Sequence, residues 1–289
     1  MSHTQSMEQQ TIKQALTKAE NEGVTLSRVE AEEFRDFQKR KRMSEIYRLT
    51  SAMEAELGDT DDMQRVCERA RRLKQSAVRL PLTKMAQAKY YLAGSDVALD
   101  CVVGGTGETL TKVKAYEARL ALKNGAKELT VRIAPSFIDG CRFAEIKKEL
   151  KRIRRLAGKK PWKVAVEKNE VSTSLVRVAR IASEVGAAYF CIPYFTGCER
   201  LRLELTGKCR LQVSGVNSAE TCNKLFSFGV GRVVTSQAWE IYNEWLADMQ
   251  KPKTTIERVT PKIEKRMDKT ANDETDYRCR LEGNKLLFY

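Results

Sequence analysis

Short apolar segments alternate with amphipathic segments through the middle of the chain. Seven short segments are rich in β-branched or apolar residues, a pattern typical of buried strands. They cover residues 76–81, 96–105, 127–135, 162–169, 187–193, 209–215 and 231–236. Between them, apolar residues recur at helical spacing, as they do over 110–125, 173–186 and 218–229. This alternation predicts βαβ units and a parallel sheet.

The number of these units points to a closed barrel. Seven of them, with an eighth strand in residues 44–53, predict an α/β fold of the (β/α)8 TIM barrel type. The segment 44–53 would serve equally well as a helix, so the position of the first strand stays open. Gly125, Gly186 and Gly229 end three of the predicted helices, where a glycine commonly supplies the C-terminal cap.

The two ends of the chain differ from its middle in composition. Residues 1–43 are polar and contain long helical patterns, so we expect an N-terminal helical extension there. The barrel is then expected over residues 44–246. A polar C-terminal tail follows over residues 247–289, either loosely ordered or wrapped on the surface, and its apolar residues 286–288 form a candidate docking patch.

Composition bears on where in the cell the protein resides and on whether it holds a metal or cofactor. The chain has no run of about 18 uninterrupted apolar residues, and its N-terminus lacks the order of a signal peptide, so we expect a cytoplasmic protein without a membrane partner. The 8 cysteines lie singly and His3 is the one histidine, which makes a structural metal improbable and leaves no cofactor implied. We expect buried, reduced thiols instead, for example Cys101 and Cys209.

The formal net charge is +14, and much of the clustered charge lies in residues 38–43 and 145–160. In the second segment Ile146, Leu150 and Ile153 recur at helical spacing, with Leu156 continuing the pattern, so the lysines and arginines lie on or beside the outer face. A solvated helix face accounts for this arrangement, whereas a surface for a nucleic-acid or protein partner is the alternative.

In a (β/α)8 barrel the working residues lie at the C-terminal ends of the strands. Within a strand only alternate residues face the interior, so Thr130 and Arg132 share a face that Val131 does not. The candidate positions are Arg79, Leu80, Gly104, Gly105, Thr130, Arg132, Glu167, Lys168, Cys191, Gln212, Ser214, Thr235 and Ser236.

Five segments, in this order, resemble the deoxyribose-phosphate aldolase family, class I aldolases on a (β/α)8 barrel. They read "VVGGTGETLTKVKAYEARLALKNGAKELTV", "WKVAVEKN", "GAAYFCIPYFTG", "RLQVSGVNSAE" and "FGVGRVVTSQ". The resemblance covers roughly residues 60–240. It implies the barrel fold and descent from enzymes that cleave a 2-deoxy sugar phosphate through a Schiff base.

The resemblance also implies that the catalytic groups of the family are missing here. The position of the Schiff-base lysine falls on Cys191, that of the neighbouring lysine on Gln212, and that of the relay aspartate on Thr130. A cysteine cannot form an imine with a carbonyl, and the helper amine and the acid are replaced as well. The chain therefore resembles a divergent member that lacks the catalytic lysines.

The phosphate site of the family is altered too. Its members hold phosphate on small-residue turns, which correspond here to Ser214-Gly215-Val216-Asn217 and to residues 234–237. Gly215 and Ser236 match the family, whereas Val216 is expected to crowd an anion at the backbone. Ser214, Arg132 and Arg79 are further candidates for binding a sugar phosphate or another small anion at the barrel mouth.

Three functions remain open. The first is a barrel without aldol chemistry that serves binding, regulation or assembly. The second is an active carbon–carbon lyase in which Lys168 takes the Schiff-base role, with Glu167 beside it; Arg132 would favour the neutral amine if the two side chains approach closely. The third is nucleic-acid binding through residues 38–43 and 145–160. Assembly into a homo-oligomer is left open by all three.

Overall fold

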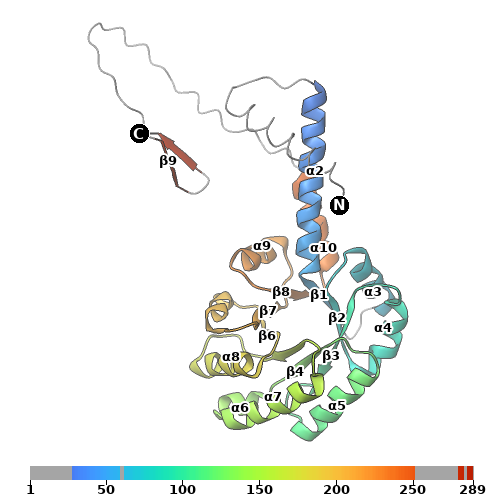
Figure 1. Cartoon of the computed structure of the whole chain (residues 1–289), viewed down its shortest axis with the longest axis vertical. Coiled ribbons are helices and arrows are strands. Elements are labelled where there is room, and N and C mark those ends of the chain that lie inside the picture. Colours follow the sequence, from blue (N-terminus) through green and yellow to red (C-terminus); the bar gives the residue numbers. More distant parts are fainter. Residues whose placement is uncertain (1–27, 59–61, 251–278, 283–284, 289) are drawn as a thin grey trace, which may run out of the picture. The chain divides into compact units, whose positions relative to one another are not determined.

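A computed structural model of the chain describes residues 28–58, 62–250, 279–282 and 285–288 (Figure 1). The chain divides into two compact units, Met1–Lys251 and Pro252–Tyr289. In the second unit, β9 (Cys279–Glu282) pairs with β10 (Lys285–Phe288) as an antiparallel ladder. The proposed docking role of residues 286–288 remains a prediction.

The first unit contains a closed barrel of eight parallel strands, which confirms the predicted (β/α)8 fold. Each strand pairs with its neighbours in the sequence, and β1 closes the ring against β8. The strands are β1 (Met53–Glu56), β2 (Ala77–Pro81), β3 (Ala98–Val103), β4 (Glu128–Arg132), β5 (Trp162–Ala165), β6 (Tyr189–Pro193), β7 (Arg210–Ser214) and β8 (Arg232–Thr235).

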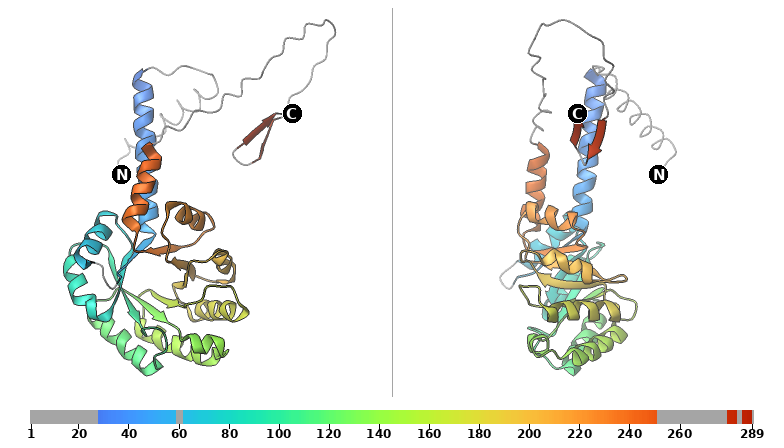
Figure 2. Two further views of the ribbon diagram at one scale, coloured as in Figure 1. Left: turned by 180° about the vertical axis from the view of Figure 1, so that it is seen from behind. Right: turned by 90° about the vertical axis from the view of Figure 1, so that its left-hand side faces the viewer.

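Helices follow the strands and cover the outside of the barrel (Figures 1 and 2). They are α2 (Arg28–Ser51), α3 (Met63–Arg72), α4 (Met85–Tyr91), α5 (Thr111–Lys123), α6 (Pro135–Asp139), α7 (Phe143–Ala157), α8 (Thr173–Val185), α9 (Ala219–Ser227) and α10 (Ala238–Gln250). Two 3-10 helices, η1 (Leu82–Lys84) and η2 (Cys198–Glu204), complete the set in the part of the chain described. Figure 2 shows α2 and α10 side by side.

The first strand is shorter and later than predicted. Residues 44–51 belong to α2, and β1 begins at Met53, so the prediction of a strand over 44–53 was wrong. Ile46 and Thr50 are both buried and lie four residues apart, so this segment buries one helical face rather than alternate residues. The predicted boundary at 43/44 falls inside α2, and the boundary at 246/247 falls inside α10.

The helical predictions hold where the apolar pattern was clear. In α7, Ile146, Leu150 and Ile153 are fully buried, and Arg152 and Arg155 are exposed, as the spacing predicted. Gly186 closes α8 with φ +83°, a left-handed conformation that glycine adopts without a steric penalty.

The barrel has an apolar outer surface and a polar interior. Along β5, Trp162 and Val164 belong to the hydrophobic core, whereas the side chain of Lys163 reaches Glu54 on β1, across the ring. The alternation recurs on other strands, where a polar or charged residue stands between two core residues: Glu54, Arg79, Asp100, Thr130 and Gln212. The interior of the barrel therefore holds the charged groups to be described next.

Candidate functional site

An enclosed network of ion pairs fills the barrel interior. Its acids are Glu54, Asp100 and Glu128, and its bases are Arg79, Lys163 and Arg232, so formal charges of both signs balance. Each acid and each base comes from a different strand, from β1 to β5 and from β8. Relative exposures run from 0% for Glu54, Asp100 and Lys163 to 9% for Arg232.

Glu54 lies at the centre of the network. One carboxylate oxygen accepts hydrogen bonds from Lys163 at 2.5 Å and from the Gln212 amide at 2.6 Å. Arg232 lies 3.4 Å from the same oxygen, and the other oxygen accepts from Nε of Arg79 at 3.1 Å. Burial alone would raise the pKa of Glu54, but the surrounding cations, Arg79 foremost, outweigh it and hold that pKa well below its usual value.

Lys163 is surrounded by carboxylates. Its ammonium lies 2.5 Å from Glu54, 2.7 Å from Glu128 and 3.0 Å from Asp100. Burial opposes a charged amine, but the attraction of the three carboxylates, led by Asp100, is larger and raises the pKa of Lys163. The amine is therefore held in its protonated form.

Asp100 differs from the other two acids in having one carboxylate oxygen without a partner. Its Oδ2 accepts from Thr130 at 2.6 Å, from Lys163 at 3.0 Å and from Arg79 at 3.3 Å. Its Oδ1 is buried and has no hydrogen-bond partner in the structure. Burial, together with the negative charge of Glu54, raises the pKa of Asp100 to about 6.

The three positions that match the aldolase catalytic residues lie in this interior. Thr130 donates to Asp100, the Cys191 thiol donates to the Gln212 side-chain oxygen at 2.9 Å, and Gln212 in turn donates to Glu54. Their relative exposures are 1% for Thr130, 2% for Cys191 and 0% for Gln212. Burial raises the pKa of the Cys191 thiol to about 12, so the thiol stays protonated and is a poor nucleophile.

The sequence predicts Arg79 as a candidate for binding an anion at the barrel mouth. Its relative exposure is only 5%, and it pairs with Glu54 and Asp100 and donates to the Cys191 sulfur at 3.7 Å. These internal partners take up its guanidinium, so the expected role at the mouth does not fit its position.

The candidates at the rim each have a carboxylate partner. Lys168 pairs with Asp139 at 2.5 Å, and Arg132 lies 3.6 Å from Glu167 and donates to the Gly105 carbonyl at 3.2 Å. An approach of Arg132 to Lys168 stays a prediction, and each of the two cations has its own carboxylate partner.

The turns after β7 and β8 are exposed, but the N–H of Gly215 donates to the Val234 carbonyl and the N–H of Gln237 donates to the Thr235 hydroxyl. Gly215 and Ser236 are exposed, and Ser214 is half-buried and donates to the Ile192 carbonyl at 3.3 Å. Val216 has a relative exposure of 1% and belongs to the hydrophobic core, and its expected crowding of an anion at the backbone stays a prediction.

A second buried ion pair supports the mouth. Lys114 on α5 pairs with Glu149 on α7 at 2.8 Å and donates to the Arg132 carbonyl at 2.8 Å, with exposures of 0% for Lys114 and 1% for Glu149. Gly104 lies over the lysine stem, and a Cβ there would come within 2.9 Å of it. The pair ties the end of β4 to two helices.

Sequence reasoning missed most of the ion network, although the sequence carries a signal for it. Glu54, Asp100 and Lys163 each stand between apolar neighbours in a short strand, at the position opposite in face to the core residues. Charged side chains there must face the barrel interior. Among the described residues, no group of three or more His, Cys, Asp or Glu side chains could hold a metal ion.

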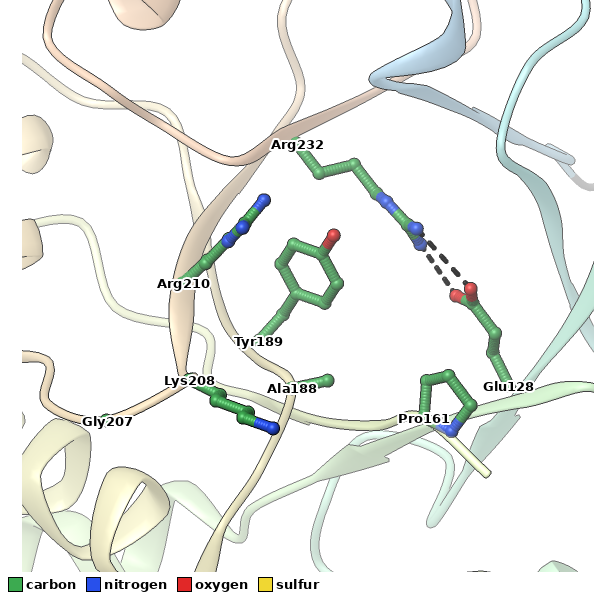
Figure 3. Close-up of a pocket in the computed structure, with 8 residues that line it drawn as sticks. All are labelled: Glu128, Pro161, Ala188, Tyr189, Gly207, Lys208, Arg210 and Arg232. Atoms are coloured by element: carbon green, nitrogen blue, oxygen red, sulfur yellow. Dashed lines mark hydrogen bonds and ion pairs between the residues drawn. The ribbon is translucent and has the colours of Figure 1, made fainter. Parts of the chain in front are cut away.

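A pocket opens at the other end of the barrel, where the strands begin (Figure 3). It has a volume of about 520 Å³ and contains the first residues of four strands: Glu128, Tyr189, Arg210 and Arg232. Arg232 binds Glu128 at 2.6 Å and lies over the ring of Tyr189, 4.5 Å from its centroid. Figure 3 shows Tyr189 between Arg210 and this ion pair.

Comparison with known proteins agrees with the resemblance in the sequence. No family model matches the chain. A deoxyribose-phosphate aldolase from Mycoplasmoides gallisepticum is 27% identical over 197 residues, which cover 64% of this chain and 87% of that protein. The chain is a divergent relative of the deoxyribose-phosphate aldolases.

Solved structures of the same group share the fold. A protein from Coccidioides immitis assigned as a deoxyribose-phosphate aldolase superimposes with a TM-score of 0.63 at 20% identity, over 73% of this chain and 96% of its own. The tetrameric deoxyribose phosphate aldolase from Aeropyrum pernix gives a TM-score of 0.59 at 17% identity, over 72% of this chain and 94% of its own. Within the described residues, no helix is long and apolar enough to cross a membrane.

Proposed function

We propose that this aldolase-like barrel does not cleave aldols and serves as a binding protein. The observation that carries the proposal is the replacement of the imine-forming lysine by Cys191, whose thiol is buried, protonated and hydrogen-bonded to Gln212. An imine requires a neutral primary amine within reach of the carbonyl carbon. A cysteine at this position offers no such amine.

The lysine inside the barrel is not a substitute for the missing one. Lys163 is fully buried and bound to three carboxylates, which stabilise its charged form. A protonated ammonium has no lone pair with which to attack a carbonyl. To act as a nucleophile, Lys163 would have to lose a proton inside a network that would then carry an uncompensated negative charge.

Lys168 is the alternative nucleophile. Its side chain has a relative exposure of 25%, so a substrate could reach it. However, its ammonium pairs with Asp139 at 2.5 Å, and Arg132 is engaged by Glu167. The arrangement supports a surface ion pair rather than a neutral, activated amine, so we do not assign Lys168 a catalytic role.

The polar interior supports descent from an enzyme. Buried ion pairs are seldom more stabilising than well-packed apolar residues of similar volume, so stability alone does not account for six charged groups inside a barrel. The six charged groups are explained if the barrel descends from an enzyme whose polar active-site positions now carry side chains that neutralise one another.

A residual anion site at the barrel mouth remains compatible with this role. Gly215 and Ser236 are exposed on the turns where the related enzymes would hold phosphate, and Ser214 lies beside them. We propose that a sugar phosphate or another small anion can still bind there without being cleaved. Self-association of this chain is a further proposal, supported by the tetrameric Aeropyrum pernix relative.

A direct assay tests the proposal. Purified protein is incubated with 2-deoxyribose 5-phosphate, and acetaldehyde, the two-carbon product of retro-aldol cleavage, is measured. We expect no release above that of a Lys163→Met variant and of buffer. Release that depends on Lys163 or on Lys168 would overturn the proposal, whereas binding of the sugar phosphate without release would support it.

A further inference from the structure

Basic side chains gather at the end of the barrel opposite the aldolase mouth. The pocket of Figure 3 adjoins a second pocket of about 500 Å³, and the two share Pro161, Ala188 and Lys208. Their lining contains six cationic side chains and a single carboxylate, that of Glu128. The cations are Arg154, Lys159, Lys160, Lys208, Arg210 and Arg232.

Much of this positive charge is available to a ligand. Glu128 is already bound to Arg232 and Lys163, so it offers little compensation to the rest of the lining. Lys159, Lys208 and Arg210 are exposed, and their side chains make no hydrogen bond or ion pair with any described residue. Three unpaired cations around two joined pockets form a surface with a strong preference for anions.

Part of the basic lining has an ordinary structural role. Arg154 donates to the carbonyl of Val185 in the last turn of α8, and Lys160 donates to the carbonyl of Ala126. Cations at helix C-termini compensate the exposed carbonyl groups there. Lys208 lies just before β7 and Arg210 is the first residue of that strand, so compensation of a helix C-terminus does not explain either cation.

The shape of the surface favours a linear polyanion with flat groups. Each pocket has the volume of a site for one small organic group, and Lys208 stands where the two meet. Tyr189 is half-buried in the first pocket, and Arg232 lies over one face of its ring, so a base would stack on the other face. A single-stranded nucleic acid presents regularly spaced phosphates together with unpaired bases, and so matches both features.

We infer that this surface, defined by Lys159, Lys208, Arg210 and Tyr189, binds single-stranded nucleic acid. The surface includes the C-terminal part of the basic segment 145–160. The exposed lysines nearer the start of α7 do not line either pocket. The surface lies where the strands begin, whereas Gly215 and Ser236 follow the ends of β7 and β8, so the inference does not depend on an anion site at the mouth.

The test is fluorescence anisotropy of labelled 20-residue single strands, RNA and DNA, with the full chain. The key variant is Lys208→Glu combined with Arg210→Glu. The matched control is Lys112→Glu combined with Arg119→Glu, two exposed α5 residues whose side chains pair with no described residue, which changes the net charge equally. A second comparison, Lys39→Glu with Arg40→Glu, probes the basic segment 38–43 on α2.

The expected effect follows from counterion release. Each phosphate contact to a single strand contributes about 0.7 to the slope of log K against log salt, so loss of two contacts lowers the slope by about 1.4. If the binding curves converge near 1 M salt, affinity in 0.1 M salt falls about 25-fold. Tyr189→Ala should weaken binding with little change in slope, because stacking releases few counterions.

Several results would overturn the inference. It fails if neither single strand binds in low salt, or if the α5 control or the α2 variant weakens binding as much as the Lys208 and Arg210 variant does. It also fails if a duplex of the same length binds more tightly than the single strands. Thermal unfolding of every variant shows whether the fold is retained, and an unfolded Lys208 and Arg210 double variant is replaced by Arg210→Ala.

Discussion

Replacing Asp100 by asparagine tests the electrostatics of the barrel interior. The change fits the site sterically, because Oδ2 of Asp100 takes all three of the hydrogen bonds and Oδ1 has none. The amide oxygen of an asparagine can take the place of Oδ2, which leaves the NH2 group where Oδ1 now lies. The variant therefore removes a titrating group while keeping an acceptor for Thr130, Arg79 and Lys163.

The magnitude follows from the pKa of Asp100. Burial raises that pKa from 3.8 to about 6 in the folded protein. At pH values between these two, the folded state binds more protons than the unfolded state, so the free energy of unfolding falls as the pH rises. A shift of this size corresponds to about 3 kcal/mol, lost between about pH 4 and pH 6.5.

The assay is urea unfolding of the wild type and Asp100→Asn across that pH range. Other carboxylates titrate too, and the low pKa of Glu54 makes the protein less stable as the pH falls below about 4, so the informative quantity is the difference between the two proteins. We expect the wild type to lose about 3 kcal/mol relative to the variant from pH 4 to pH 7. Asp139→Asn, which alters an exposed carboxylate outside the barrel interior, is the control for the loss of one carboxylate.

The reasoning would be refuted by a difference between wild type and Asp100→Asn that does not change with pH. It would also be refuted by a difference of opposite slope, because that result would mean that the pKa of Asp100 is lowered in the folded protein. Either outcome would show that the cations around Asp100 outweigh its burial.

Further substitutions and a labelling experiment separate the interior from the rim. Lys163→Met should lower the free energy of unfolding by about 3–5 kcal/mol in urea titrations, because it leaves buried carboxylates without their shared cation. Lys168→Ala should change it by less than about 1 kcal/mol, since its ion pair with Asp139 is partly exposed. In native protein at pH 8, iodoacetamide should modify the exposed Cys141 and spare Cys191, whose thiol is buried with a pKa of about 12; peptide mapping that finds Cys191 labelled first would contradict this.

The fold could be predicted because its signal is local. Most strands and amphipathic helices can be recognised from a pattern of about ten residues. The burial of Ile146 and Ile153, for example, follows from their helical spacing. The first strand was misplaced because the sequence of residues 44–51 is compatible with a strand and with a helix. The burial of Ile46 and Thr50, four residues apart, identifies the helix.

The site was predictable only in part, because its contacts join distant strands. The resemblance located Cys191 and Gln212, which are indeed hydrogen-bonded to each other. The partners of Glu54 are 25 to 178 residues away in the sequence, so no local pattern identifies them. For the same reason Arg79 was assigned to the mouth, although two carboxylates hold it inside.

The most direct test of the lost aldolase chemistry is reductive trapping. The protein is incubated with 2-deoxyribose 5-phosphate and sodium borohydride, which reduces any imine to a stable amine, and its mass is measured intact and after digestion. We predict an unmodified chain, because Lys163 is protonated and enclosed and Cys191 cannot form an imine. A stoichiometric adduct on Lys163 or Lys168 would contradict the account.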